Sequence, residues 1–319
     1  MILLTGGTGF VGRHLIQQFT LDSRPVRVLS RGPRPATMPD SVAWATGDLR
    51  QPDSLHAALR GVDTVVHAAA VLPGGAVTEH DLDSANADGT GAIARAAQTA
   101  GVLRFVHISS AGVYGDGLTA APHRESDLPS PGNAYERSKL AAERSLVAAL
   151  DRSDIAWTIL RPQGLYAADR PATAQQFHEI ATRRLWIHGA ARVVVHPTHI
   201  TDLASVVALV IDRPDLHGEV INVGGSRALE LRGLIDLIGA RVGHTPLQVA
   251  LPRAAGRLAA LIARGWSTFG IPPAALMRQS REWINRAVSI EKAQRLLDFR
   301  PLALELGLDQ TAAQLARVA

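Results

Sequence analysis

A glycine-rich turn between an apolar strand and a helix constrains the fold of this chain more than any other feature. Residues 1–4 form an apolar run typical of a strand, and residues 13–20 have a helical pattern. Between them, the segment 5–12 reads TGGTGFVG, with glycines at positions 6, 7, 9 and 12. Such glycines permit a tight turn, close approach of the backbone to a pyrophosphate, and close packing of helix on strand. Because a helix N-terminus also offers free N–H groups to phosphates, the turn predicts a nucleotide site. A plain structural turn is the alternative.

Strands and helices alternate along the first half of the chain. The apolar runs predict strands at 26–29, 42–45, 64–67, 105–108 and 157–160, and helical patterns fall at 51–59, 81–100 and 134–150. This alternation predicts an α/β fold of the Rossmann type, a doubly wound parallel sheet. Ligands of such sheets bind at the carboxyl ends of the strands. We therefore expect residues 1–165 to form an NAD(P)-binding domain.

The second half of the chain is less regular. Residues 192–196 and 219–223 predict two more strands, and the expectation is that residues 192–226 return to the nucleotide domain. Residues 166–191 and 227–319 are expected to form a smaller, mostly helical C-terminal lobe for the substrate. Four large side chains of this lobe suit either an apolar pocket or the core between helices: Trp266, Phe269, Met277 and Trp283. Arg183, Arg184 and Arg192 suit either a diphosphate clamp or a solvated surface.

Composition excludes several classes of function. The chain has no cysteine, which excludes disulfide scaffolds, iron–sulfur sites and thiol chemistry. Its 33 basic and 29 acidic residues are spread out, so no nucleic-acid partner is expected. No apolar run approaches the ~18 residues of a membrane span, and because the glycine-rich turn stands at the start of the sequence, we expect no signal peptide. His196 and His199 lack a third ligand at a suitable spacing, so no metal is expected. We expect a cytoplasmic protein with a small-molecule substrate, and a homodimer is left open.

The end of the second strand bears on cofactor choice. NAD sites usually place an acidic residue there to bind the ribose 2′-hydroxyl. This chain has Ser30 and Arg31 instead, with Arg34 close by. Because a guanidinium matches a phosphate in charge and geometry, the pattern favours NADP, with NAD as the alternative. A solvated arginine also fits. After the third strand, the spacing of Asp48 and Leu49 suits either an adenine contact or a helix cap.

A tyrosine and a lysine four residues apart mark the chemical site. Tyr135 and Lys139 lie on one face of the predicted helix 134–150, and Ser110 follows the fifth strand. An ammonium beside a phenol favours the phenolate, so we expect a lowered pKa for Tyr135. Such a phenol can donate a proton near neutral pH and take it back in the reverse reaction. The chain contains only two lysines and three tyrosines, which makes a chance pair improbable.

These motifs together resemble the extended short-chain dehydrogenase/reductases, within the NAD(P)-dependent epimerase/dehydratase group that includes 3β-hydroxysteroid dehydrogenases. The segments that carry the resemblance are TGGTGFVG (5–12), GDL (47–49), HAAA (67–70), NADGT (86–90), SSAGVYG (109–115), YERSK (135–139), RP (161–162) and the region 288–301. The resemblance implies that Tyr135 is the general acid/base, that Lys139 lowers its pKa and holds the nicotinamide ribose, and that Ser110 binds the reacting oxygen. It also favours an adenine contact over a helix cap as the role of Asp48. The cofactor-binding residues expected in all are Gly6, Thr8, Gly9, Phe10, Val11, Gly12, Ser30, Arg31, Asp48, Leu49, Ala68, Ala69, Ala70, Asn86, Tyr135, Lys139 and Pro162.

Departures from the family pattern narrow the function. The dehydratases of this group carry an Asp-Glu pair after the catalytic Ser/Thr, where this chain has Ala111 and Gly112, which disfavours dehydration. Epimerases of the group commonly bind NAD tightly and carry an acid after the second strand, unlike Ser30-Arg31. The sequence thus favours an NADPH-dependent oxidoreductase that interconverts a ketone and an alcohol. An NAD-dependent sugar-nucleotide epimerase and a non-catalytic NAD(P)-sensing regulator are the alternatives.

Overall fold

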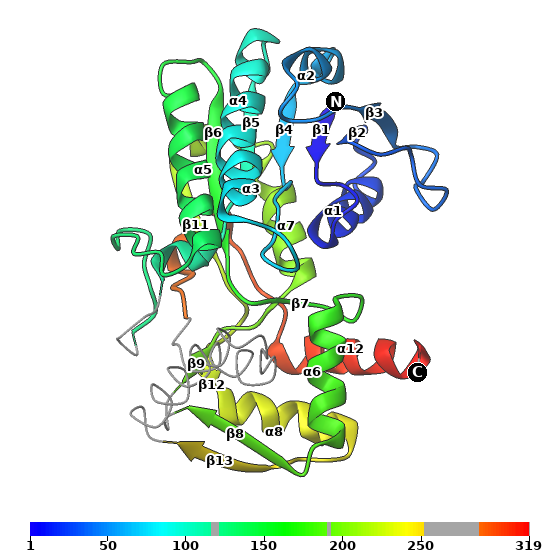
Figure 1. Cartoon of the computed structure of the whole chain (residues 1–319), viewed down its shortest axis with the longest axis vertical. Coiled ribbons are helices and arrows are strands. Elements are labelled where there is room, and N and C mark those ends of the chain that lie inside the picture. Colours follow the sequence, from blue (N-terminus) through cyan, green and yellow to red (C-terminus); the bar gives the residue numbers. More distant parts are fainter. Residues whose placement is uncertain (116–120, 190–192, 252–286, 319) are drawn as a thin grey trace.

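A seven-stranded parallel sheet forms the centre of the protein (Figure 1). The computed structural model describes residues 1–115, 121–189, 193–251 and 287–318. The strand order is β11-β6-β5-β4-β1-β2-β3, and every neighbouring pair is parallel. The strands are β1 (Ile2–Thr5), β2 (Val26–Ser30), β3 (Ala43–Thr46), β4 (Thr64–His67), β5 (Arg104–Ile108), β6 (Ala156–Pro162) and β11 (Glu219–Val223). The order reverses at β1, as in the Rossmann arrangement, and the predicted fold class is confirmed.

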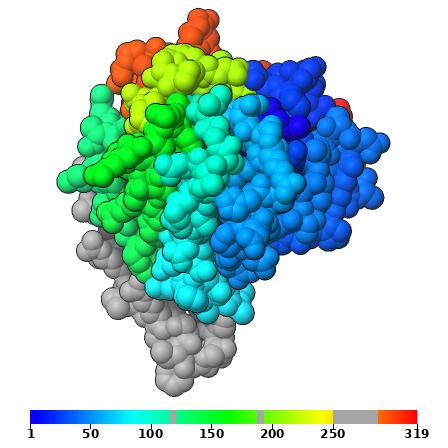
Figure 2. Space-filling model, turned by 90° about the horizontal axis from the view of Figure 1, so that it is seen from above, coloured from blue at the N-terminus to red at the C-terminus, as the bar shows by residue number. Residues whose placement is uncertain are grey.

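Helices cover both faces of this sheet. The helices α1 (Phe10–Leu21) and α7 (Ile200–Val210) pack together on one face. The opposite face carries α2 (Pro52–Leu59), α4 (Gly89–Thr99) and α5 (Ala134–Leu150), and Figure 2 shows the cyan and green segments of α4 and α5 side by side. Each helix therefore buries an apolar stripe against strands that are themselves apolar on both faces.

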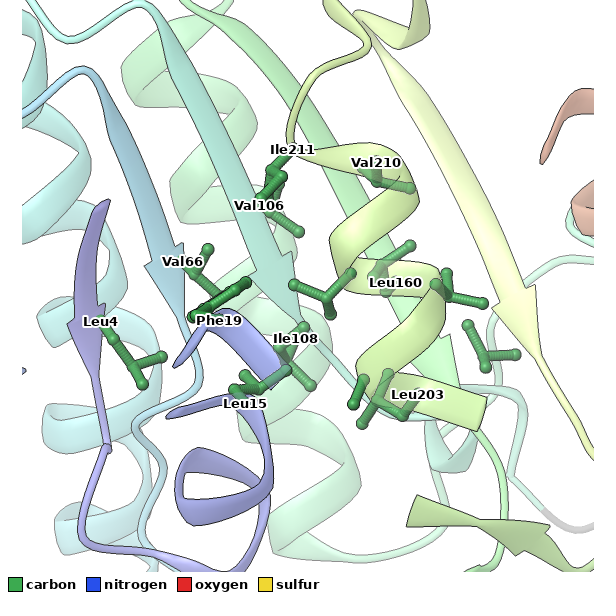
Figure 3. Close-up of a cluster of buried hydrophobic side chains, with 14 of the residues drawn as sticks. Leu4, Leu15, Phe19, Val66, Val106, Ile108, Leu160, Leu203, Val210 and Ile211 are labelled. Atoms are coloured by element: carbon green, nitrogen blue, oxygen red, sulfur yellow. The ribbon is translucent and has the colours of Figure 1, made fainter. Parts of the chain in front are cut away.

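Two apolar cores hold these layers together. Figure 3 shows the core under α1 and α7, where Leu15 and Phe19 from α1 and Leu203 from α7 meet strand side chains such as Val66 and Val106. Phe19 and Leu203 have no solvent exposure, and each such side chain contributes roughly 1.5–3 kcal/mol by leaving water. This packing fixes the strand ends that carry the candidate site.

The predicted helix at 81–100 is divided into three parts. A capping box at Thr78 begins the short helix α3 (Glu79–Leu82), a π-helical segment spans Asp83–Asp88, and α4 follows. In the π-helical segment, the side chain of Asn86 bonds the backbone of Val71 and the hydroxyl of Ser138. The widened turn thus places a buried amide between the loop after β4 and the helix α5, and π-helical turns are frequent at functional sites.

A second lobe lies below the carboxyl ends of the sheet strands (Figure 1). It contains α6 (Pro171–Thr182), α8 (Leu231–Val242) and α12 (Leu304–Val318), which share an apolar core with Phe177 and Ile180. Three small sheets accompany them, pairing β7 (Leu165–Tyr166) with β10 (Thr198–His199), β8 (Leu185–Gly189) with β13 (Leu247–Leu251), and β9 (Val194–Val195) with β12 (Leu229–Glu230). A short helix, α11 (Glu291–Leu297), packs against β11 and α7.

One predicted strand has a different place in the structure. Of the two later strands expected, β11 joins the central sheet beside β6, whereas residues 192–196 supply only β9. β9 pairs antiparallel with β12, outside the central sheet, because the next residues turn into β10 and α7. Trp266, Phe269, Met277 and Trp283 lie outside the described residues. Among the helices of the described ranges, none combines the length and the apolar character that crossing a membrane requires.

Candidate functional site

A groove of about 520 Å³ runs along the carboxyl ends of β1, β2, β3 and β4. Ten of the expected cofactor-binding residues line it: Gly6, Thr8, Gly9, Ser30, Arg31, Asp48, Leu49, Ala68, Ala69 and Ala70. The sequence brings them together because parallel strands end at one edge of the sheet. The groove also takes in residues that sequence reasoning did not select, among them Arg50, His80 and Asp81.

The glycine-rich turn is tight enough to require its glycines. Gly6 has a φ of +73°, and a Cβ there would lie 2.7 Å from the backbone of Ala68. A Cβ on Gly12 would lie 2.1 Å from the carbonyl oxygen of Gly6. Gly9 stands directly before α1 and supplies no side-chain cap, and the first turn of α1 carries no acidic residue. The positive end of this helix is therefore not neutralised by a carboxylate of its own turn, which suits a bound anion.

Three charged side chains, Arg31, Asp48 and Arg50, line the groove beyond the ends of β2 and β3. Arg50 donates to both carboxylate oxygens of Asp48, with its Nη2 2.6 Å from Oδ2. This contact, helped by the charge of Arg31, holds the pKa of Asp48 at about 2. Arg31 makes no hydrogen bond or ion pair with the described residues. The end of β2 thus presents a cation with unused donors, while the carboxylate of Asp48 already has a partner.

The catalytic candidates gather where β5 ends. The ammonium of Lys139 is buried and donates to the carbonyl of Ile108 at 2.8 Å. Ser110 lies two residues further on and caps a short 3-10 helix, Ala111–Tyr114, accepting from the N–H of Gly112 at 3.0 Å. Tyr135 precedes Lys139 by one turn of α5. The bond from Lys139 to Ile108 therefore ties the helix that carries the phenol to the strand that carries the serine.

The electrostatics of this cluster differ from the sequence expectation. Burial raises the pKa of Tyr135, the charge of Arg170 opposes this rise, and Glu136 adds to it. Burial lowers the pKa of Lys139 to about 8, with the charge of Glu143 opposing. The phenol pKa is thus shifted upward and not downward, because burial outweighs the neighbouring charges. The cation that acts on the phenol in this structure is Arg170.

Arg170 belongs to a segment that sequence reasoning did not connect with the site. Its guanidinium lies 5.6 Å from the ring centroid of Phe10, the first residue of α1, and it donates to the carbonyl of Leu165. The preceding residue, Asp169, binds Arg13 and His14 of α1, each at 3.0 Å. The loop that enters α6 is therefore fastened to the nucleotide helix. No local pattern in the sequence signals this contact, because it joins residues more than 150 positions apart.

The remaining expected residues are placed around the groove and the catalytic cluster. Phe10, Val11 and Gly12 begin α1, and Pro162 ends β6. Asn86 is buried and links the loop after β4 to Ser138 on α5. Arg183 pairs with Glu179 at 3.1 Å and stacks on Trp186, while Arg192 lies outside the described residues.

The groove fits the adenosine and phosphate parts of a dinucleotide. The uncapped N-terminus of α1 suits a pyrophosphate, and Arg31 offers unused donors where the ribose would lie. Ser110 follows β5, the strand beside β4, and Tyr135 and Lys139 lie in the first two turns of α5. This arrangement can bind a dinucleotide and can donate a proton to an oxygen at the catalytic cluster.

Comparison with known proteins agrees with this geometry. The family model described as NAD dependent epimerase/dehydratase family matches residues 2–224. A 4-hydroxy-2-methyl-3-oxo-4-farnesyl-3,4-dihydroquinoline-1-oxide ketoreductase of Stigmatella aurantiaca is 29% identical over 310 residues, which cover 93% of this chain and 90% of the relative. A 3-beta-hydroxysteroid dehydrogenase of Mycolicibacterium neoaurum is 29% identical over 325 residues, covering 94% of this chain and 87% of the relative.

A solved structure has a similar fold. MoeE5 in complex with UDP-glucuronic acid and NAD superposes with a TM-score of 0.79 at 24% identity, covering 100% of this chain and 99% of that one. At this identity the likeness speaks to the fold alone.

Proposed function

Because this chain belongs to the NAD dependent epimerase/dehydratase family, we propose that it is an NADPH-dependent oxidoreductase that reduces a ketone to an alcohol. Family and relatives establish an NAD(P)-dependent enzyme of the extended short-chain dehydrogenase/reductase type. The choice of NADPH and the direction of the reaction are our proposal. Two relatives named as a ketoreductase and a hydroxysteroid dehydrogenase support redox chemistry over isomerisation.

The cofactor proposal rests on the position of Arg31 and on its lack of a hydrogen-bond partner among the described residues. It lines the groove at the end of β2 and makes no hydrogen bond or ion pair with the described residues. A 2′-phosphate would give it a charge-assisted, bidentate partner. An NAD site would place a carboxylate there, and this strand ends in Ser30-Arg31 instead.

The residues of the catalytic cluster would divide the work of carbonyl reduction. When bound, a nicotinamide supplies the hydride. Tyr135 would donate its hydroxyl proton to the carbonyl oxygen, and Ser110 would hold that oxygen through a hydrogen bond. Arg170, whose charge favours the phenolate of Tyr135, would together with Lys139 stabilise the phenolate that remains, which takes up a proton before the next turnover. The two hydrogen bonds stabilise the negative charge that develops on the oxygen.

Further parts of the proposal concern organisation. We keep the division into a nucleotide domain of residues 1–165, with 192–226 returning to it, and a substrate lobe of residues 166–191 and 227–319. A cytoplasmic location, where NADPH is available, and a homodimer are likewise proposals.

The test is a spectrophotometric screen of NADPH and NADH oxidation against steroid, flavonoid, sugar-nucleotide and small aliphatic ketones. A reductase consumes one NADPH for each ketone reduced and retains little cofactor on purification. Copurification with one equivalent of NAD, together with interconversion of a sugar nucleotide without added cofactor, would instead establish an epimerase. Cofactor binding with no turnover that depends on Tyr135 would indicate a regulator.

A further inference from the structure

A buried ion pair lies directly behind the catalytic cluster. Glu143 of α5 accepts from Arg161 of β6 at both oxygens, 2.9 Å from Nε and 2.6 Å from Nη2. The hydroxyl of Ser109 donates to the same carboxylate at 2.5 Å. Both charged side chains are only 6% exposed. A buried ion pair adds little net stability, because desolvation offsets its attraction, so its place beside the site calls for a further reason.

The partners of this pair connect the segments that carry the site. Ser109 precedes Ser110 at the end of β5, and Arg161 precedes Pro162 at the end of β6. Glu143 lies on the same helix as Tyr135 and two turns further on. One carboxylate therefore contacts the two strand ends and the helix on which the catalytic candidates stand.

The network continues to the edge of the sheet. Arg161 donates to the hydroxyl of Tyr114 at 2.9 Å, and that hydroxyl donates to Asn222 of β11, also at 2.9 Å. Asn222 in turn donates to Glu125 and to the carbonyl of His123. The carboxyl ends of β5, β6 and β11 are thus joined by a continuous chain of polar contacts.

Glu143 also faces Lys139, four residues before it on the same side of α5. Tyr135 lies one turn before Lys139 on α5, and the charge of Lys139 also acts on His67 of β4 and His107 of β5. Burial holds the pKa of His67 at about 3 and that of His107 well below its usual range, so both rings are neutral. Glu143 supplies the one opposing charge that raises the pKa of Lys139.

We propose that Glu143 is a positioning residue of the catalytic site. By binding Arg161 and Ser109 it holds the two strand ends against α5, and its negative charge keeps Lys139 protonated at neutral pH. The role deepens the proposed function, on which its catalytic consequence rests, whereas its effect on Lys139 does not depend on that function.

The two lysines of the chain make the charge effect directly measurable. Protein labelled with ¹³C-lysine gives two sets of side-chain NMR signals, from Lys139 and Lys292, and Lys292→Arg assigns them. Lys292 lies on the helix α11, binds Glu219 of β11 at 2.5 Å, and serves as the internal control. In Glu143→Gln the titration of Lys139 is expected to move down by about one pH unit, with Lys292 unchanged.

A second variant keeps the test valid if Glu143→Gln folds poorly. Glu143→Gln with Arg161→Gln removes both buried charges, and it is expected to fold while Lys139 still titrates below its wild-type value. The matched control is Thr158→Val, which removes a buried hydroxyl between β5 and β6 at the opposite ends of these strands. It is expected to leave Lys139 unchanged.

An unchanged Lys139 titration in both Glu143 variants would overturn the charge role. With a ketone from the screen, the alkaline loss of kcat should also move to lower pH in Glu143→Gln and stay in place in Thr158→Val. A shift of the NMR titration with no ketone reduced by wild type would contradict the proposed function and leave the role of Glu143 toward Lys139 intact.

Discussion

Two arginines are buried on the neighbouring strands β5 and β6, one at each end and on opposite faces of the sheet, and their surroundings differ. Arg104 begins β5 and donates to the carbonyls of Ala156 and Val210 and to the hydroxyl of Thr158, all of them neutral acceptors. Arg161, near the end of β6, binds the carboxylate of Glu143 instead. The two residues are equally buried, at 4% and 5% exposure.

The comparison shows that this sheet can bury a guanidinium without an ion pair. Burial lowers the pKa of Arg104 to about 10, with the charge of Asp215 opposing, so the guanidinium remains charged at neutral pH without an ion pair of its own among the described residues. At the other end, burial also lowers the pKa of Arg161, but the bonds and the charge of Glu143 outweigh burial and raise it. Since a guanidinium can be buried in this sheet without a carboxylate, the presence of Glu143 beside Arg161 is better explained by the neighbours of Glu143, namely Ser109 and Lys139.

The largest effect is expected at the catalytic end of the strands. Tyr135→Phe removes one hydroxyl and should lower kcat by about 10²–10⁴-fold, because proton donation to the carbonyl oxygen is lost. Cofactor affinity, measured by the change in protein fluorescence, should stay nearly the same. Tyr166→Phe, which removes a hydroxyl from a buried tyrosine of the second lobe, is the control. Equal kcat in the two variants would remove Tyr135 from the mechanism.

The two arginines should differ in their contribution to stability. Arg161→Met leaves the carboxylate of Glu143 buried without its partner and should cost about 3–5 kcal/mol. Arg104→Met leaves only neutral acceptors unpaired, which should cost about 1–3 kcal/mol. Urea unfolding at pH 7 measures both free energies. A larger loss for Arg104→Met would mean that the ion pair is not the more demanding arrangement.

Cofactor choice tests a region of the groove away from the ion pair. Arg31→Asp should weaken NADPH binding by about 10–100-fold, which corresponds to the loss of a charge-assisted hydrogen bond of about 1.5–3 kcal/mol. NADH binding should be retained. Arg34→Gln is the control, since Arg34 is already bonded to the carbonyls of Met38 and Pro39 and to Asp40. Tighter binding of NADH than of NADPH by wild type, at equal salt, would refute the NADPH proposal.

Much of the sheet domain could be predicted from local patterns. The helix expected at 134–150 is α5, Ala134–Leu150, and the strand expected at 64–67 is β4. Apolar runs and glycine turns fix such elements locally, and family membership confirms the resemblance drawn from the motifs. The apolar run at 192–196 was less informative, because its pairing with β12 depends on contacts distant in sequence.

The sequence predicted which residues form the site better than it predicted their pKa values. The spacing of Tyr135 and Lys139 indicated the pair, yet not that burial would outweigh charge at the phenol. Arg170 approaches the site only through tertiary contacts with α1. Glu143 did leave a signal, since it follows Lys139 by four residues on a helix, but only the structure shows its contacts with Ser109 and Arg161. The roles of the site residues stay predictions.

The smallest expected effect concerns a second buried carboxyl, which lacks the partners of Glu143. Asp202 of α7 accepts from the N–H of Leu302 at 2.8 Å through one oxygen, and its other oxygen has no partner among the described residues. Burial raises its pKa to about 6. Since the unfolded chain ionises near pH 4, the folded protein holds the extra proton between about pH 4 and 6. Asp202 therefore makes its full contribution to the free energy of unfolding below pH 4, and this contribution falls as the pH rises from 4 to 6.

Asp202→Asn imitates the protonated acid and should escape this loss. The variant should gain stability over wild type as the pH rises, by roughly 2 kcal/mol between pH 4 and pH 7. Thermal unfolding of both proteins at each pH measures the difference, and other titrating groups cancel in it. Glu143→Gln should instead lose stability at pH 7, because it leaves Arg161 buried without its ion-pair partner. A difference between Asp202→Asn and wild type that is the same at pH 4 and pH 7 would show that Asp202 ionises normally in the folded protein, and the contrast between the two carboxyls would then fail.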